Sequence, residues 1–179
     1  MTTLRPPVND RDQQTGNLES GLTLVEYGDY QCPYCRRAHP FVQRLLMELG
    51  SEVRFVFRHF PLREIHAQAL PAALSAEAAG KQGKFWQMHD LLFKHQDRFQ
   101  EKTLFIDLAK ELGLDLDRFL IDRMGDEIAR KVEKDFDGGI YSGVNRTPTF
   151  FANESKVYAY DGTYDSLLTT IELFRVDRI

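Results

Sequence analysis

The period of apolar positions changes several times along the chain, and each stretch of constant period predicts one element. Residues 22–27 are apolar on both faces, which is typical of a central strand covered on both sides, although Glu26 lies among them. From residue 38 to 49, apolar side chains recur every three or four positions, as in an amphipathic helix that Gly50 can end. Residues 52–60 then predict a second strand.

Helical periodicity dominates the middle of the chain, from about residue 65 to residue 141. Glycines help to separate five predicted helices, over residues 66–79, 84–94, 103–112, 117–124 and 126–141. Strand patterns return at residues 149–152 and 156–160, joined as a hairpin, and a final helix begins near residue 163. The predicted order is strand, helix, strand, helical block, hairpin and helix.

Length and composition fit one domain, or one domain with a large insertion. The 179 residues are 42% hydrophobic and 28% charged, and the formal net charge of −4 argues against nucleic-acid binding. No apolar run is long enough to span a bilayer, and residues 1–10 lack the apolar core of a secretory signal. A cytoplasmic protein is therefore expected, while a trimmed signal or a larger parent polypeptide stays open. Residues 1–20 are polar, which predicts an N-terminal arm.

Both cysteines of the chain lie in one short motif, Cys32-Pro33-Tyr34-Cys35. A cross-link that closes so short a loop adds little stability, so the pair is predicted to be reactive. The order strand, motif, helix places Cys32 at a helix N-terminus, where free backbone N–H groups and the helix dipole stabilise a thiolate. We expect Cys32 to be the nucleophile and the less exposed Cys35 to resolve the mixed disulfide.

Two other interpretations of the cysteine pair are weaker. The thiols could join His39 or His59 in a zinc site, but no second ligand pair has zinc-finger spacing. They could also be two inert thiols at a chance spacing. We therefore predict neither a metal nor an organic cofactor, because two sulfurs suffice to hold the redox equivalents.

Residues far from the motif complete a pattern that resembles the DsbA-like branch of the thioredoxin superfamily. The pattern contains an acid six residues before the first cysteine, a proline five residues after the second, and a Thr-Pro pair before a strand. It also contains a strand that leads into an Ala-rich helix. These features are Glu26, Pro40, Thr147-Pro148, and residues 57–62 with the helix after them. The resemblance covers the chain from about residue 16 to the C-terminus.

The resemblance implies a thioredoxin-like α/β fold with an inserted all-helical subdomain. Residues 21–62 and 142–179 would form the thioredoxin-like domain, and residues 63–141 the helical insertion. The implied function is protein disulfide oxidoreduction, with protein thiols and disulfides as partners and glutathione as a further candidate. Neither nucleic acid nor a membrane segment is expected, and a monomer is favoured.

Glu26 matches the buried acid of the superfamily. Partial desolvation on an apolar face would raise its pKa and suit it to exchange a proton with Cys35. The alternative is a buried acid paired with Arg54 or Arg58, and the two roles are compatible.

Thr147 and Pro148 match the element whose proline is cis, and the alternative is an ordinary trans turn. A cis bond would bring the Thr147 backbone beside Cys32, where an extended substrate can pair with it. Pro33 and Tyr34, between the cysteines, are expected to contact substrate as well. Arg37, with its neighbour Arg36, could contact a carboxylate of glutathione, although solvated helix positions are the simpler interpretation.

Tyr34 departs from the strongest oxidants of the DsbA branch, which carry histidine at that position. Pro-Tyr is the glutaredoxin dipeptide, so we predict an intermediate reduction potential and leave the direction of exchange open. Two other function classes compete. One is a glutathione-dependent transferase or isomerase of the kappa type, which usually lacks the second cysteine. The other is a non-catalytic binding or regulatory module.

Overall fold

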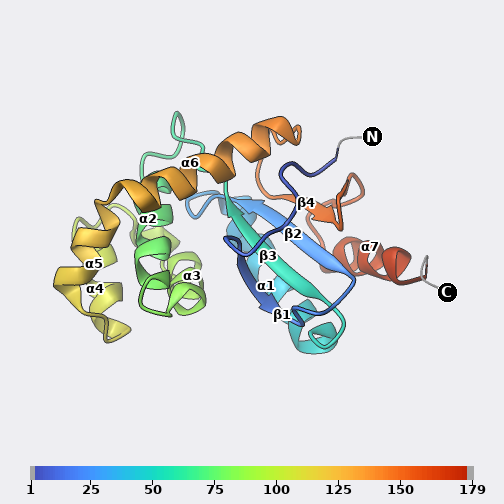
Figure 1. The fold of residues 1–179 in the computed structure, drawn as a ribbon, viewed down its shortest axis with the longest axis horizontal. Helices are drawn as coiled ribbons and strands as arrows, with labels where there is room; N and C mark the ends of the chain where they lie inside the picture. Colours follow the sequence, from blue (N-terminus) through green and yellow to red (C-terminus); the bar gives the residue numbers. More distant parts are fainter. Residues whose placement is uncertain (1–2, 177–179) are drawn as a thin grey trace.

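The computed structural model describes residues 3–176, which form a mixed five-stranded sheet flanked by helices (Figure 1). The sheet order is β1-β3-β2-β4-β5, in which only β2 and β3 run parallel. The strands are β1 Gln13–Gly16, β2 Thr23–Gly28, β3 Arg54–His59, β4 Thr149–Ala152 and β5 Ser155–Lys156. The last strand is therefore shorter than the predicted 156–160.

Seven α-helices and one short 3₁₀ segment are assigned within the described residues, close to the predicted positions. They are α1 Pro33–Leu49, α2 Ala69–Gly80, α3 Phe85–Lys94, η1 Gln96–Arg98, α4 Leu104–Glu111, α5 Leu116–Arg123, α6 Asp126–Tyr141 and α7 Tyr164–Val176. Figure 1 shows α2 to α5 gathered beyond one side of the sheet, with α6 running back from them to the sheet. None of the described helices combines the length and apolar character that crossing a bilayer requires.

Each face of the sheet has its own apolar core. One face carries Leu24, Phe55 and Phe150, which pack with buried residues of α1, α3 and α7. That core continues without a break into α4 and α5, so the helical block shares its interior with the sheet. The other face carries Val25 and Phe151, and α6 and the N-terminal segment cover it. The alternation of side chains along β2 explains why both of its faces are apolar.

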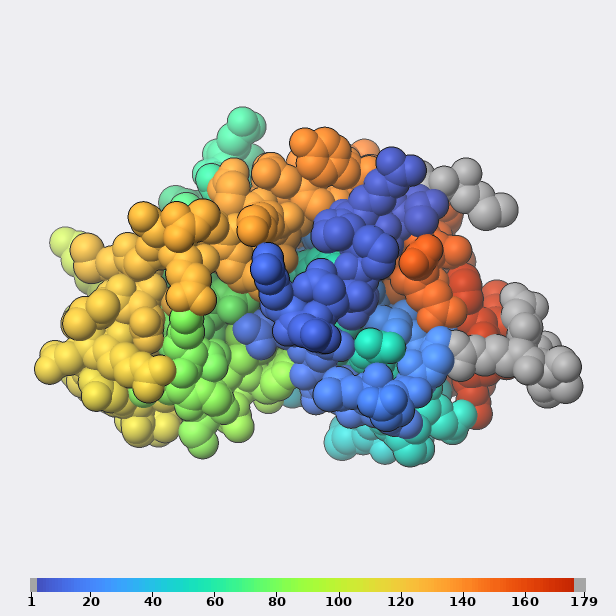
Figure 2. Space-filling view, in the orientation of Figure 1, coloured from blue at the N-terminus to red at the C-terminus, as the bar shows by residue number. Residues whose placement is uncertain are grey.

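The stretch predicted as an N-terminal arm is tied to the sheet along most of its described length. Gln13–Gly16 forms the edge strand β1, and Leu4 is 2% exposed in the core of the far face. In Figure 2 this segment lies across the molecule between α6 and the β4–β5 hairpin. The sequence gives little sign of β1, because pairing with β3 rather than an apolar pattern holds it in place.

Candidate active site

Cys32 lies between the end of β2 and the start of α1. Cys32 is the residue that caps the helix N-terminus, with extended backbone angles, and Pro33 is the first helical residue. Proline suits this position because its missing N–H would have no partner there. Both cysteines are free thiols; Cys32 is 3% exposed and Cys35 is fully buried.

The two thiols differ in acidity. A hydrogen bond from the Cys35 side chain, helped by the backbone N–H groups of Tyr34 and Cys35, lowers the pKa of Cys32 to about 6, against the opposing effect of burial. Burial is the main cause that raises the pKa of Cys35 well above its ordinary value, and the hydrogen bond to Cys32 adds to it. At neutral pH the pair therefore holds one thiolate, on Cys32, and one thiol, on Cys35.

Thr147 approaches the same sulfur from the far end of the chain. The peptide bond between Thr147 and Pro148 is cis, and the carbonyl oxygen of Thr147 lies 3.4 Å from Sγ of Cys32. Both residues precede β4, which pairs antiparallel with β2. The strand pairing thus places the Thr147-Pro148 element directly beside the motif.

Glu26 lies on β2 beneath the motif and is 2% exposed. Its Oε1 has no hydrogen-bond partner among the described residues. Burial, followed by the charge of Cys32, raises the pKa of Glu26 to about 8. The charge of Glu26 in turn contributes to the raised pKa of Cys35. The carboxylate of Glu26 and the thiol of Cys35 therefore interact.

The alternative in which Glu26 pairs with Arg54 or Arg58 is wrong. Glu26 lies opposite Phe57 in the β2–β3 register, whereas Arg54 and Arg58 belong to the alternate positions of β3. Side chains alternate between the two faces of a sheet, so both guanidinium groups point away from Glu26. Arg58 instead pairs with Asp12 of the N-terminal segment.

The helical block braces the loop that carries Cys32. Nε2 of Gln96 donates to the carbonyl oxygens of both Tyr30 and Cys32, at 2.8 and 3.0 Å. Oε1 of Gln31 accepts from the backbone N–H of Gln68 at 2.6 Å. The backbone around the nucleophile is therefore held by residues outside the thioredoxin-like core.

Asp29, the residue after β2, extends this bracing. Its Oδ1 accepts from the N–H of Gln31, and its Oδ2 accepts from the N–H of Leu62 and contacts Nδ1 of His66 at 2.7 Å. The sequence alone did not reveal the role of Asp29 or Gln96. Their partners are distant in sequence, and no local pattern marks them.

The structure separates the histidines from the sulfurs. Nε2 of His39 lies 3.1 Å from Asp90, and Nε2 of His59 lies 2.8 Å from Glu77. Within the described part of the chain, two groups of side chains have metal-ligand geometry, and neither contains a cysteine. The alternative of a zinc site on the cysteine pair therefore has no support.

Comparison with known proteins agrees with this geometry. The family model Thioredoxin_4, described as thioredoxin, matches residues 9–172. The chain belongs to the thioredoxin family.

Two solved structures superpose on nearly the whole chain. A thioredoxin-like oxidoreductase from Silicibacter pomeroyi is 28% identical, with a TM-score of 0.80 and coverage of 93% of this chain and 94% of that one. Oxidised BdbD from Bacillus subtilis is 27% identical, with a TM-score of 0.81 and the same coverage. The predicted resemblance and fold class, a thioredoxin-like fold with an inserted helical subdomain, are confirmed.

The curated relatives of this thioredoxin-family chain are much longer than it is. The Na(+)/H(+) antiporter NhaA 1 of Salinispora arenicola is 46% identical over 166 residues, which is 90% of this chain and 24% of the relative. The chain therefore spans about a quarter of the length of that relative.

Proposed function

We propose that this chain is a thiol–disulfide oxidoreductase that exchanges disulfides with protein substrates through Cys32 and Cys35. The observation that carries the proposal is the asymmetry of the two thiols. Cys32 has a pKa of about 6 at the start of α1, while Cys35 is buried and stays protonated. One stabilised thiolate beside one reserve thiol is the arrangement that two-step disulfide exchange requires. The solved relatives at 27% and 28% identity, an oxidoreductase and BdbD, support the same chemistry.

In the reducing direction, the Cys32 thiolate attacks one sulfur of a substrate disulfide. The bond between Cys32 and that sulfur forms, the substrate S–S bond breaks, and the second substrate sulfur leaves as a thiolate. Cys35 then loses its proton and attacks Cys32, which releases the first substrate sulfur and leaves the Cys32–Cys35 disulfide. Two electrons pass to the substrate; the oxidising direction runs the same steps backwards.

Glu26 is the proposed acceptor of the proton that Cys35 must lose. A carboxyl group with a pKa of about 8 exchanges protons readily near neutral pH. The charge of Glu26 also raises the pKa of Cys35, so the two groups lie close enough to interact. Thr147 and Pro148 are the proposed docking edge, because the carbonyl of Thr147 lies beside the reacting sulfur. Tyr34 lines the same surface hollow as Thr147 and Pro148, and Pro33 precedes it at the start of α1; both are proposed substrate contacts.

A trapping experiment tests the function directly. Cys35→Ser removes the resolving thiol, so substrates attacked by Cys32 should accumulate as mixed disulfides that mass spectrometry identifies. Cys32→Ser is the matched control and should trap nothing. Absence of any trapped protein or glutathione from Cys35→Ser, with a folded variant, would contradict the proposal.

A second candidate function is a redox domain within a longer transport protein. The match to a quarter of an antiporter sequence favours it, and it agrees with the larger parent polypeptide that the sequence leaves open. In a polypeptide that joins an antiporter to this chain, the rate of Na⁺/H⁺ exchange would then differ between oxidising and reducing conditions. Cys32→Ser would remove that difference. Identical exchange in the parent and the Cys32→Ser form would remove this candidate.

A further inference from the structure

A groove runs along the surface beside the docking edge. It encloses about 400 Å³ and is lined by Tyr34 and Arg37 of α1, by Arg146 and Pro148 before β4, and by Tyr160 after β5. A second hollow of about 370 Å³ shares Arg146, Pro148 and Tyr160, and continues it along the β4–β5 hairpin. Thr147, whose carbonyl oxygen contacts the Cys32 sulfur, also lines the first hollow. The groove therefore reaches the residue that contacts the reacting sulfur.

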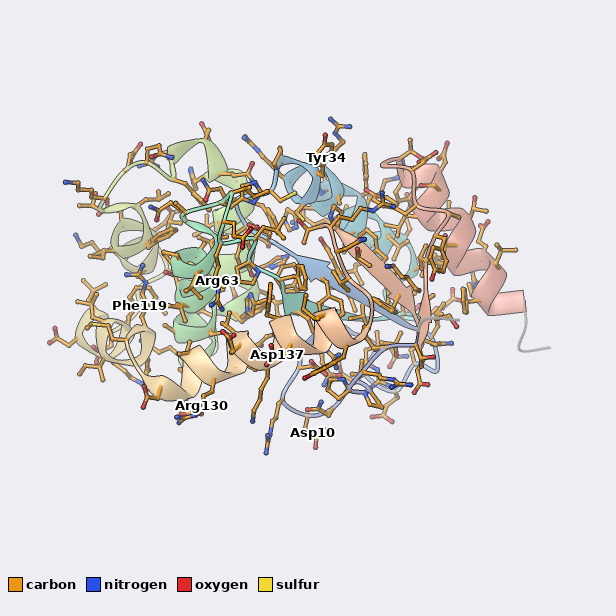
Figure 3. All side chains as sticks on the ribbon, turned by 90° about the horizontal axis from the view of Figure 1, so that it is seen from above. Asp10, Tyr34, Arg63, Phe119, Arg130 and Asp137 are labelled. Carbon is orange, nitrogen blue, oxygen red and sulfur yellow. The ribbon has the colours of Figure 1, made fainter. Side chains whose placement is uncertain are left out.

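Aromatic rings form much of the groove wall. Tyr34 is 63% exposed and points away from the fold at the start of α1 (Figure 3). Tyr160 is half-buried and packs edge-on against Phe150, with ring centroids 4.9 Å apart. Such rings offer flat contact area to an extended peptide at small cost in side-chain entropy.

Positive charge dominates the rim. Arg37 and Arg146 are both exposed, and neither forms an ion pair with a described residue. The guanidinium of Arg37 lies 5.8 Å from the centroid of the Tyr34 ring. Burial raises the pKa of Tyr160, and the positive charge of Arg37 opposes that rise. Arg37 is therefore close enough to Tyr160, across the groove, to interact with it electrostatically.

Negative charge along the groove is already engaged within the protein. Asp161 is the acidic residue among the described linings of the two hollows. Its Oδ1 accepts hydrogen bonds from the backbone N–H and the hydroxyl of Thr163, at 3.0 and 2.6 Å. Neither arginine forms an ion pair with Asp161, so two guanidinium groups face one carboxylate in this groove.

We propose that this groove selects protein substrates that carry Asp or Glu within one or two residues of the reacting cysteine. The inference rests on the proposed function and names the substrate class of the same site. Arg146 is the immediate neighbour of Thr147, and an extended chain advances about 3.3 Å per residue. A substrate cysteine at Cys32 therefore places its first or second neighbour opposite the arginines, where an unpaired guanidinium binds a carboxylate.

Peptide disulfides test the charge preference. Three peptides would each carry one cysteine, flanked on both sides by Asp, Ser or Lys and blocked as a disulfide with thionitrobenzoate. The Cys32 thiolate of the Cys35→Ser variant attacks the peptide sulfur, and the coloured thionitrobenzoate leaves as a thiolate. Reaction of the same peptides with 2-mercaptoethanol corrects for their intrinsic reactivity.

After that correction, the Asp peptide should react about three- to tenfold faster than the Lys peptide at low salt, and the difference should shrink as salt rises. Arg37→Glu or Arg146→Glu should remove or reverse the order, while the Ser peptide changes less. Arg130→Glu is the matched control and should keep the order, because Arg130 on α6 points to the opposite side of the molecule from Tyr34 (Figure 3).

The outcomes distinguish failure of the proposed function from failure of the charge preference. A Ser peptide that fails to react with Cys32 would contradict the proposed function itself. A Ser peptide that reacts normally, with equal corrected rates for Asp and Lys, would overturn the charge preference alone. Oxidised glutathione gives the last outcome. If its reaction alone slowed when either arginine was replaced, the charge preference for protein substrates would be overturned, because the groove would then bind glutathione and not a protein segment.

Discussion

The sulfur of Cys32 lies 3.4 Å from the carbonyl oxygen of Thr147, 115 positions further along the chain. The contact joins the residue that caps α1 to the segment that leads into β4. The sulfur is therefore held between a helix N-terminus, which favours its anion, and a backbone edge that an extended substrate can use. The acidity of Cys32 depends on the helix N-terminus, on Cys35 and on Thr147, so it can be measured without any substrate.

Alkylation of Cys32 should follow the titration of a thiol with a pKa of about 6. Only the thiolate reacts with iodoacetamide, so the rate should rise through pH 6 and level off below pH 8. Cys35→Ala removes the hydrogen bond that contributes most to the low pKa, and its midpoint should move toward the ordinary value of 9.0. A midpoint that stays at 6 in Cys35→Ala would assign the acidity to the helix N-terminus and to Thr147, and not to the Cys35 side chain.

The reduction potential should lie between those of thioredoxin and DsbA. Thioredoxin combines a cysteine pKa of about 7 with about −270 mV, and DsbA combines about 3.5 with about −120 mV. Interpolation at the pKa of about 6 for Cys32 gives roughly −230 mV, close to the glutaredoxin range. Equilibration with glutathione redox buffers, followed by quantification of free thiols, measures it. A value near −120 mV would show that the Pro-Tyr dipeptide does not moderate this site.

The core of the active site was predictable because its chemistry is local in sequence. Cys32 and Cys35 share one motif, and strong periodicity marks the strand before it and the helix after it. The absence of an arginine partner for Glu26 was not predictable in the same way. Which face of β3 meets Glu26 depends on the β2–β3 register, and a displacement of one residue exchanges the two faces.

Glu26→Gln should change stability in a pH-dependent manner. The pKa of Glu26 is about 8 in the folded protein and near 4.5 when unfolded, so the folded state binds more protons between these values. The free energy of unfolding therefore falls as pH rises from 4.5 to 8, by up to about 5 kcal/mol from this group. Glutamine removes the charge, so the variant should gain a few kcal/mol over the parent at pH 8.5 and little at pH 5.

Urea unfolding of the reduced protein at the two pH values measures this effect. Glu19→Gln, at an exposed position, is the matched control and should shift stability equally at both. Cys32→Ser should weaken the pH dependence, because the charge of Cys32 is the second cause of the raised pKa of Glu26. Equal gains for Glu26→Gln at pH 5 and pH 8.5 would mean that Glu26 ionises normally in the fold.

Sequence patterns do not predict the structure of the N-terminal segment. Gln13 and Gln14 have no strand periodicity, yet they pair with Phe57 and Val56 of β3. Leu4 is an isolated apolar residue in a largely polar stretch, yet it is buried on the far face of the sheet. Such placements depend on contacts made with the rest of the fold, and a local window of sequence does not contain them.

Asp12→Asn should destabilise the protein by about 3–5 kcal/mol, because it leaves a buried guanidinium without its counter-charge. Nε and one terminal nitrogen of Arg58 donate to the two carboxylate oxygens of Asp12 at 2.8 and 2.9 Å, and the side chains are 2% and 4% exposed. Asp10→Asn, two positions away and exposed, should leave the urea midpoint unchanged.

A double-variant cycle then separates the pair from its surroundings. Arg58 also donates to the carbonyl oxygens of Pro6 and Pro7 and to the hydroxyl of Tyr27, so Arg58→Met alone frees several acceptors. Asp12→Leu combined with Arg58→Met should cost clearly less than the sum of the single changes, because no isolated charge stays buried. Additive costs would mean that the two side chains act independently. The ion pair would then not be what fastens the N-terminal segment to β3.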